Sequence, residues 1–144
     1  MYSYSDAQTN PRRLVLVAVG EPDRRSICAV HSAVRLPAVE HRAVHVAVDG
    51  YETTLLANWW MDAQPEGLRL EIVDDRGGVA ETIATYARAR LEQGFDEVLV
   101  LVGHLARVTA ARVLLHDHTA MSIYEAVHDI PGVTSVLVPV GLES

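Results

Sequence analysis

The chain contains five short stretches with the pattern of β-strands. Four of them, at 14–19, 43–48, 97–102 and 133–140, are largely continuous apolar runs, which are typical of strands covered on both faces. The fifth, at 68–73, alternates apolar and polar residues, which predicts a strand at an edge of the sheet. The pattern therefore predicts a sheet whose central strands are buried on both sides.

The segments between these strands have helical spacing. They predict one helix between Pro22 and Pro37, and three more over about 51–63, 79–92 and 117–129. Pro22 is suited to the first turn of the first helix. Strands that alternate with helices in this way favour an α/β fold, an open doubly wound parallel sheet of five strands with right-handed crossovers.

Several side chains in these elements have a structural interpretation. We expect Ile27, Val30 and Val34 to form the apolar stripe of the first helix, with His31 at the edge of the core. His45 lies in the middle of the second strand and is expected to bond a backbone or side-chain partner. Because Pro139 lacks a backbone N–H, the last strand should lie at an edge of the sheet. We therefore expect a homodimer formed through 133–140.

Composition limits the partners of the protein. The 144-residue chain has a formal net charge of −7, and its twelve basic residues are all arginine, which excludes general nucleic-acid binding. Its single cysteine fits a reducing cytosol. No run of residues predicts direct membrane insertion or a signal peptide. We expect a cytoplasmic protein with a polar, flexible tether at 1–12 and one domain at 13–144, and such a tether could join the domain to a transporter.

The stretch from the fourth strand to the last helix is the strongest candidate for a binding site. Ligands of doubly wound sheets bind at the carboxyl ends of the strands. There the apolar run breaks at Gly103, a loop carries Arg107 and Arg112, and a helix begins near Asp117. A strand, a glycine turn, a basic loop and a helix N-terminus together favour an anion such as the phosphate of a nucleotide. Asp117 is best explained as the helix N-cap.

The residues predicted to bind a nucleotide come from the same end of the sheet. Arg107 and Arg112 could contact phosphate, although solvated surface arginines explain them equally well. Val19 and Val46 could flank an adenine, and His104 could contact the ligand. The full predicted set consists of Val19, Gly20, Val46, Gly103, His104, Arg107, Arg112, His116, His118 and Thr119.

Catalytic and metal-binding motifs are missing from the sequence. It contains no G-x-S-x-G, no G-x-x-x-x-G-K-[ST] and no G-x-G-x-x-G. His116 and His118 would point to nearly opposite sides of a helix, which disfavours a metal site. We therefore expect no catalysis, no metal and no resident cofactor. A small hydrolase with His104 or His116 as its base is the enzyme alternative.

The stretch after the fourth strand resembles the universal stress protein superfamily. Its ATP-binding members carry G-x-x-G, nine residues, and then G-[ST]. In this chain Gly103-His104-Leu105-Ala106 is followed by nine residues and by His116-Asp117, so the spacing matches while one of the small residues is kept. Gly20 stands where such proteins carry an acidic residue after the first strand. The resemblance implies the same β-α-β-α-β-α-β-α-β order.

A narrower resemblance covers about 13–142. The stretch from Leu114 to Ala120, LLHDHTA, is similar to an L-L-H-N-x-T-A pattern of the cytosolic C-terminal domains of potassium and amino-acid permeases of the amino acid–polyamine–organocation class. The ending from Gly132 to Val140, the segment from Val46 to Asp49, and the pair Trp59-Trp60 are similar as well.

That resemblance implies a dimeric, non-catalytic regulatory module. It would bind an adenine nucleotide, with cyclic di-AMP as the first expectation, and control the transmembrane part of a permease. The alternative is a stand-alone stress-protein-like dimer that binds ATP or AMP, or that acts through protein contacts alone.

Overall fold

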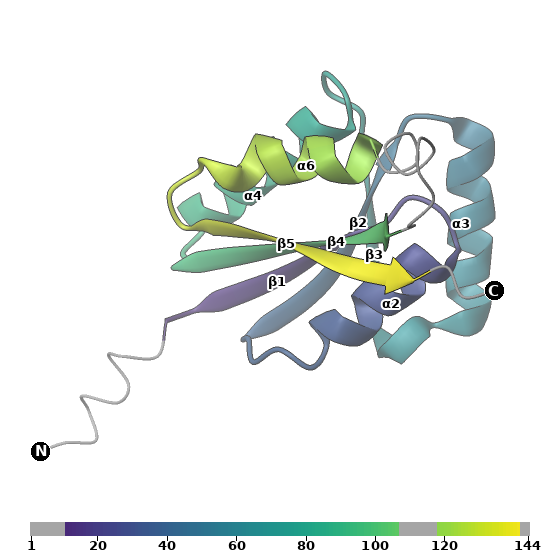
Figure 1. Cartoon of the computed structure of the whole chain (residues 1–144), viewed down its shortest axis with the longest axis horizontal. Helices are drawn as coiled ribbons and strands as arrows, with labels where there is room; N and C mark the ends of the chain where they lie inside the picture. Colours follow the sequence, from purple (N-terminus) through teal and green to yellow (C-terminus); the bar gives the residue numbers. More distant parts are fainter. Residues whose placement is uncertain (1–10, 107–117, 142–144) are drawn as a thin grey trace, which may run out of the picture.

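The computed structural model describes residues 11–106 and 118–141. These residues form a five-stranded parallel sheet with the strand order β3-β2-β1-β4-β5 (Figure 1). The strands are β1 (Arg13–Ala18), β2 (Glu40–Ala47), β3 (Leu70–Asp74), β4 (Glu97–Ala106) and β5 (Val133–Gly141). The helices are α2 (Arg24–Ala33), α3 (Gly50–Ala63), α4 (Val79–Glu92) and α6 (His118–His128), and a 3₁₀ turn, η1 (Pro65–Gly67), precedes β3.

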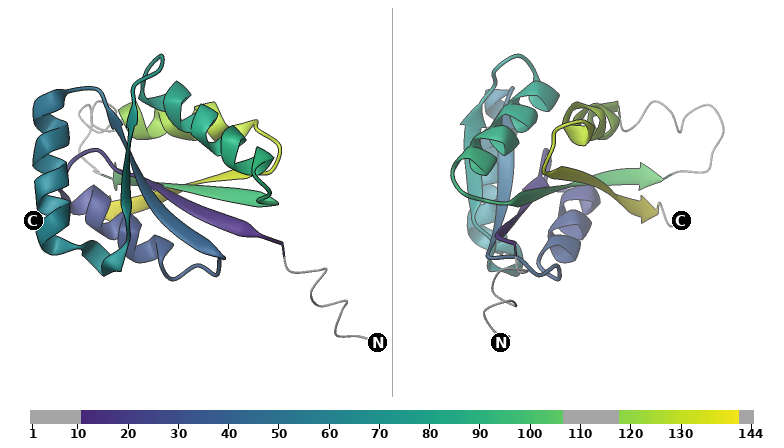
Figure 2. Two further views of the ribbon diagram at one scale, coloured as in Figure 1. Left: turned by 180° about the vertical axis from the view of Figure 1, so that it is seen from behind. Right: turned by 90° about the vertical axis from the view of Figure 1, so that its left-hand side faces the viewer.

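The helices cover both faces of the sheet (Figure 2). Alternate residues of the central strands point to opposite faces, so Leu14 and Leu16 pack under α4 and α6 while Val15 and Val17 pack against α2 and α3. All four of these side chains are fully buried. The predicted doubly wound α/β fold is confirmed.

Both predicted edge strands are also confirmed. β3, with its alternating pattern, lies at one edge, and β5 lies at the other. Pro139 has no backbone N–H, and its position in edge strand β5 explains why this is tolerated. The predicted tether at 1–12 falls mostly on residues 1–10, which lie outside the described residues, as does Asp117 with its predicted capping role.

The predicted end of the fourth strand at Gly103 is wrong. β4 continues to Ala106, with Gly103 in register with Val138 and His104 in register with Pro139. The strand continues because β5 extends alongside it to Gly141 and supplies a pairing partner. His104 is consequently a strand residue and not the first residue of a loop.

The first helix begins later and buries a different face than predicted. Asp23 is the N-cap, so Pro22 lies outside the helix. Ile27 is 46% exposed, because the buried face consists of Ser26, Ala29, Val30 and Ala33. Small residues on this face let α2 lie close to the sheet.

His31, predicted at the edge of the core, is an exposed residue. Its Nδ1 atom lies 2.9 Å from Oε2 of Glu66 in the 3₁₀ turn η1, and its side chain is 53% exposed. The predicted partner of His45 is confirmed, since its Nδ1 donates to the carbonyl of Val19 at 2.9 Å. Because Nδ1 carries the proton in the neutral ring, Nε2 accepts from the hydroxyl of Thr53, also at 2.9 Å.

Candidate functional site

A cavity of about 300 Å³ opens at the carboxyl ends of the strands. From β1 the chain adds β2 and β3 on one side, and it then returns to add β4 and β5 on the other side. The strand order therefore reverses between β1 and β4. This is the position at which open α/β sheets bind ligands. The described residues that line the cavity are Ala18, Val19, Gly20, Glu21, Asp23, Arg25, Ser26, Val44, His45, Val46, Val48, Asp49, Glu52, Val79, Ile83, Val102, Gly103, Thr119, Ala120 and Ile123.

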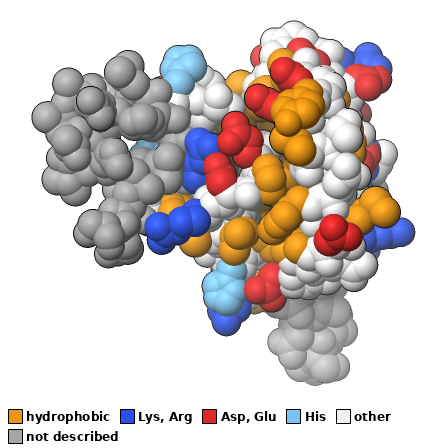
Figure 3. Space-filling model, turned by 90° about the vertical axis from the view of Figure 1, so that its right-hand side faces the viewer, with side chains coloured by type: hydrophobic (Ala, Val, Ile, Leu, Met, Phe, Trp, Pro, Cys, Tyr) orange, Lys and Arg blue, Asp and Glu red, His pale blue; other side chains and the backbone are white. Residues whose placement is uncertain are grey.

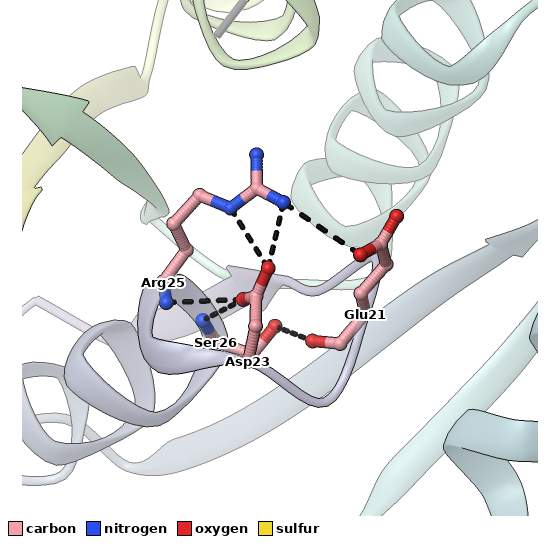
Figure 4. Close-up of polar contacts among 4 residues, drawn as sticks. All are labelled: Glu21, Asp23, Arg25 and Ser26. Carbon is pink, nitrogen blue, oxygen red and sulfur yellow. Dashed lines mark hydrogen bonds and ion pairs between the residues drawn. The ribbon is translucent and has the colours of Figure 1, made fainter. Parts of the chain in front are cut away.

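The loop after β1 forms one rim of the cavity around Asp23 and Arg25 (Figure 4). One carboxylate oxygen of Asp23, Oδ1, accepts from the backbone N–H groups of Arg25 at 3.0 Å and Ser26 at 3.3 Å, and so caps α2. Its other oxygen, Oδ2, accepts from the guanidinium of Arg25, from Nε at 3.0 Å and from Nη2 at 2.6 Å. Asp23 therefore starts the helix and orients the arginine at once.

Two further contacts complete this rim. Nη2 of Arg25 lies 3.9 Å from the carboxylate of Glu21, and the hydroxyl of Ser26 donates to the backbone carbonyl of Glu21 at 2.5 Å. The hydroxyl bond ties the loop back onto the first turn of α2. The Arg25 side chain is 27% exposed, so its ion pairs are partly shielded from water.

Gly103 makes room for this first helical turn. A Cβ atom added at Gly103 would lie 2.3 Å from the carbonyl oxygen of Arg25 and 2.8 Å from its Cα. No side chain can occupy that position without movement of the backbone. Gly103, predicted to bind a nucleotide, thus lets helix α2 approach β4 and sets the position of the Arg25 backbone.

The loop after β2 forms a second, acidic rim. Asp49 caps α3 by accepting from the backbone N–H groups of Tyr51 at 2.8 Å and Glu52 at 3.3 Å. Together with Glu21 and Asp23, the side chains of Asp49 and Glu52 place four carboxylates around the cavity. Arg25 is the one Lys or Arg in the part of the lining that the structure describes.

The floor of the cavity is apolar and comes from both layers of the fold. Val46 and Val102 belong to the cluster under α4 and α6, and Val19 belongs to the cluster under α2 and α3. Thr119 and Ala120 contribute the beginning of α6. An apolar floor with a few polar groups at its rim suits an organic ring that carries a polar substituent.

The structure brings together half of the residues predicted to bind a nucleotide. Val19, Gly20, Val46, Gly103 and Thr119 all line the cavity.

The other half is not brought to the cavity by the described residues. His104 and His118 are outside its lining, whereas Arg107, Arg112 and His116 lie outside the described residues. The loop at 74–78 is not part of the cavity lining; Asp74 and Arg76 border a separate hollow beside β3.

Arg25 and the four carboxylates are absent from the set of residues predicted to bind a nucleotide. Their position in the chain is the signal that could have found them, because the loop after β1 and the first turn of the following helix regularly line the crevice of a doubly wound sheet. Glu21 and Asp23 lie in that loop after Gly20, and Arg25 lies in the first turn of α2. Asp49 was visible as the residue that ends β2 and precedes a helix.

Among the described residues, no three His, Cys, Asp or Glu side chains are placed so that they could hold a metal ion. No helix within 11–106 or 118–141 is long and apolar enough to cross a membrane.

The chain is similar to a known protein family. Residues 11–140 match the family model described as the KimA potassium transporter C-terminal domain. The matched range includes the whole sheet up to Pro139 and Val140 and every residue that lines the cavity. No curated protein matches the chain significantly.

Proposed function

The chain belongs to the family of KimA potassium transporter C-terminal domains, and from that premise we propose that it is a regulatory domain that binds an adenine nucleotide. The observation that carries the proposal is the cavity at the point where the strand order reverses. Cyclic di-AMP is the first ligand to test. Binding would alter how the domain contacts the transmembrane part of a potassium transporter, with no chemistry of its own.

The size and lining of the cavity support a nucleoside. Its volume of about 300 Å³ is at the lower limit of typical ligand pockets, which suits a base and its sugar. Val19, Val46 and Val102 supply apolar surface for the flat ring. The carboxylates of Asp49 and Glu52 can accept hydrogen bonds from ribose hydroxyls or from an exocyclic amine.

The charge of the lining disfavours a triphosphate. Four carboxylates and one guanidinium surround the cavity in its described part, so a ligand with many negative charges is repelled. Two phosphodiester groups carry less charge than ATP, which supports cyclic di-AMP or AMP as the first choice.

Calorimetric titration of the domain with cyclic di-AMP, AMP and ATP tests the proposal. We expect heat of binding with cyclic di-AMP, and a weaker signal with ATP. Gly20→Leu should abolish binding without unfolding the protein, because a Cβ added at Gly20 meets no atom within 4 Å and the residue lines the cavity. Gly50→Leu is the matched control, since the space around its Cβ is equally open and it is not part of the lining. The proposal fails if none of the three nucleotides gives heat.

A module that acts through protein contacts alone is the second candidate. It is supported by the outer side of α3 and the turn before it, where Val48, Tyr51, Leu55 and Met61 are between 46% and 73% exposed (Figure 3). Exposed apolar side chains that gather on one face are typical of protein-binding surfaces. Tyr51→Ser and Leu55→Ser together should then abolish self-association or transporter binding and leave stability unchanged.

Dimerisation through β5 remains a further part of the proposal. β5 is an edge strand, and its free edge can pair with a second copy. Light scattering at rising protein concentration should give twice the monomer mass. A constant monomer mass contradicts it.

A further inference from the structure

We infer that Arg25 is the residue that contacts the phosphate of the bound nucleotide. This inference rests on the proposed function and adds to it the chemical group that recognises the anionic part of the ligand. It moves phosphate recognition from the loop after β4, where the sequence predicted it, to the first turn of α2.

The charge around the cavity carries the first step. Every other charged side chain in the described lining is a carboxylate. A phosphate placed beside Asp49 or Glu52 would meet carboxylates alone, whereas one beside Arg25 also meets a guanidinium, the group that donates charge-assisted hydrogen bonds to phosphate oxygens. In the described lining, the guanidinium therefore lies on the α2 rim beside Asp23 and Glu21, whereas the charged side chains of the α3 rim are carboxylates alone.

The second step is the orientation of the guanidinium. Asp23 accepts from Nε and Nη2 of Arg25, and Asp23 is itself fixed by two backbone N–H groups of α2. The arginine therefore keeps its orientation without help from a ligand, and little side-chain entropy is lost when an anion binds. Figure 4 shows the guanidinium extending from the first turn of α2 beside Asp23 and Glu21.

The third step concerns position. The backbone of Arg25 lies against Gly103, where no Cβ fits, so the arginine begins at the carboxyl end of β4, next to the reversal point of the sheet. The N-terminus of α2 faces the same cavity, since Asp23, Arg25 and Ser26 all line it. The partial positive charge of that helix end adds to the attraction for an anion.

Paired titrations with AMP and adenosine test the inference, because the two ligands differ only in the phosphate. The wild-type domain should bind AMP about tenfold or more tightly than adenosine, as expected for a charge-assisted contact. Arg25→Gln should remove this preference and leave the affinity for adenosine unchanged. Cyclic di-AMP should lose affinity by a similar factor in the same variant.

Arg24→Gln is the matched control. It removes the same charge from the neighbouring position, which is exposed and absent from the cavity lining, so the preference for AMP should persist. Arg25→Lys keeps the charge but not the paired donors, and should retain part of the preference. Urea unfolding of each variant establishes that it is folded, and the Lys variant carries the test if Arg25→Gln does not fold.

The outcomes separate the two proposals. If the wild-type domain binds none of the three ligands, the proposed function fails and this inference fails with it. If the wild-type domain binds them, but the ratio of its affinities for AMP and adenosine is the same as in Arg25→Gln, the inference alone is overturned. Equal affinity of the wild type for AMP and adenosine also overturns it.

Discussion

Arg25 and Arg42 are both held by carboxylates, but their contacts differ in kind. Arg25 at the cavity and Arg42 in β2 are about equally exposed, at 27% and 24% of their side chains. Solvent access therefore does not distinguish them. Their partners do, because the side-chain contacts of Arg25 to Asp23 and Glu21 stay within one loop and helix turn, whereas those of Arg42 join separate elements.

Arg42 connects two strands and a helix. Its Nη1 donates to the hydroxyl of Tyr86 in α4 at 2.6 Å and to Glu71 in β3 at 3.2 Å, and its Nη2 donates to Glu40 in β2. The Tyr86 hydroxyl in turn donates to Glu71 at 2.5 Å, and the guanidinium of Arg90 lies over the Tyr86 ring, 4.6 Å from its centroid. Burial works against the charge of Arg42, but its hydrogen bonds to Tyr86 and Glu40 outweigh burial and raise its pKa.

The difference shows which arginine can exchange partners at low cost. Loss of the Arg42 contacts would remove side-chain hydrogen bonds that join β2 to edge strand β3 and to α4, so Arg42 contributes to the stability of the fold. Asp23 and Glu21 are near neighbours of Arg25 in the chain, and a ligand could replace these two carboxylates without the movement of any strand. Such local contacts suit a binding residue, because the protein can stay folded when the arginine exchanges them for contacts with a ligand.

Gly103→Ala is expected to lower the free energy of unfolding the most, because the added Cβ would displace the backbone of Arg25. The new Cβ would lie 2.3 Å from the Arg25 carbonyl oxygen, so α2 must move, and we expect a loss of about 3 kcal/mol in the free energy of unfolding. Urea unfolding measures it. Gly20→Ala is the control, since nothing lies within 4 Å of its Cβ and the stability should change by less than about 0.5 kcal/mol. Equal stability of the two variants would contradict the close packing of α2 on β4.

Arg42→Met and Arg25→Met test the comparison directly. Removal of Arg42 leaves Glu71 and Tyr86 without their shared donor, and we expect a loss of about 2 kcal/mol. Removal of Arg25 ends local ion pairs near the surface and should cost less than about 1 kcal/mol. Both values come from urea unfolding at neutral pH. A larger loss for Arg25→Met than for Arg42→Met would reverse the assignment of roles.

The smallest expected effect is the pH dependence that Tyr86 adds at alkaline pH. Burial, helped by the hydrogen bond to Glu71, raises the pKa of Tyr86 above its ordinary value. The folded state then holds the phenol proton more tightly than the unfolded state, so this stability is complete below about pH 10 and is lost as the pH rises through the folded pKa. Thermal unfolding from pH 8 to pH 11 should show a steeper decline for the wild type than for Tyr86→Phe. Parallel declines would contradict the raised pKa.

The fold could be predicted from the sequence, whereas the site could be predicted only in part. Val19, Gly20 and Val46 line the cavity as expected, because the carboxyl ends of parallel strands meet at one edge whatever the details of packing. The sequence misplaces His104 because a glycine after an apolar run predicts the end of a strand, whereas pairing with β5 extends β4 beyond Gly103. The predicted phosphate-binding residues Arg107 and Arg112 lie outside the described residues.

The sequence pattern is sufficient to predict the five strands, their burial and the two edges of the sheet. These features depend on local pattern, since a strand covered on both faces must be apolar throughout and a proline is tolerated at an edge. The reason that Gly103 is a glycine, and the position of Arg25 at the cavity, are evident only from the packed molecule. Both follow from how closely α2 approaches β4, and such a distance between segments far apart in the chain depends on the packing of the whole core.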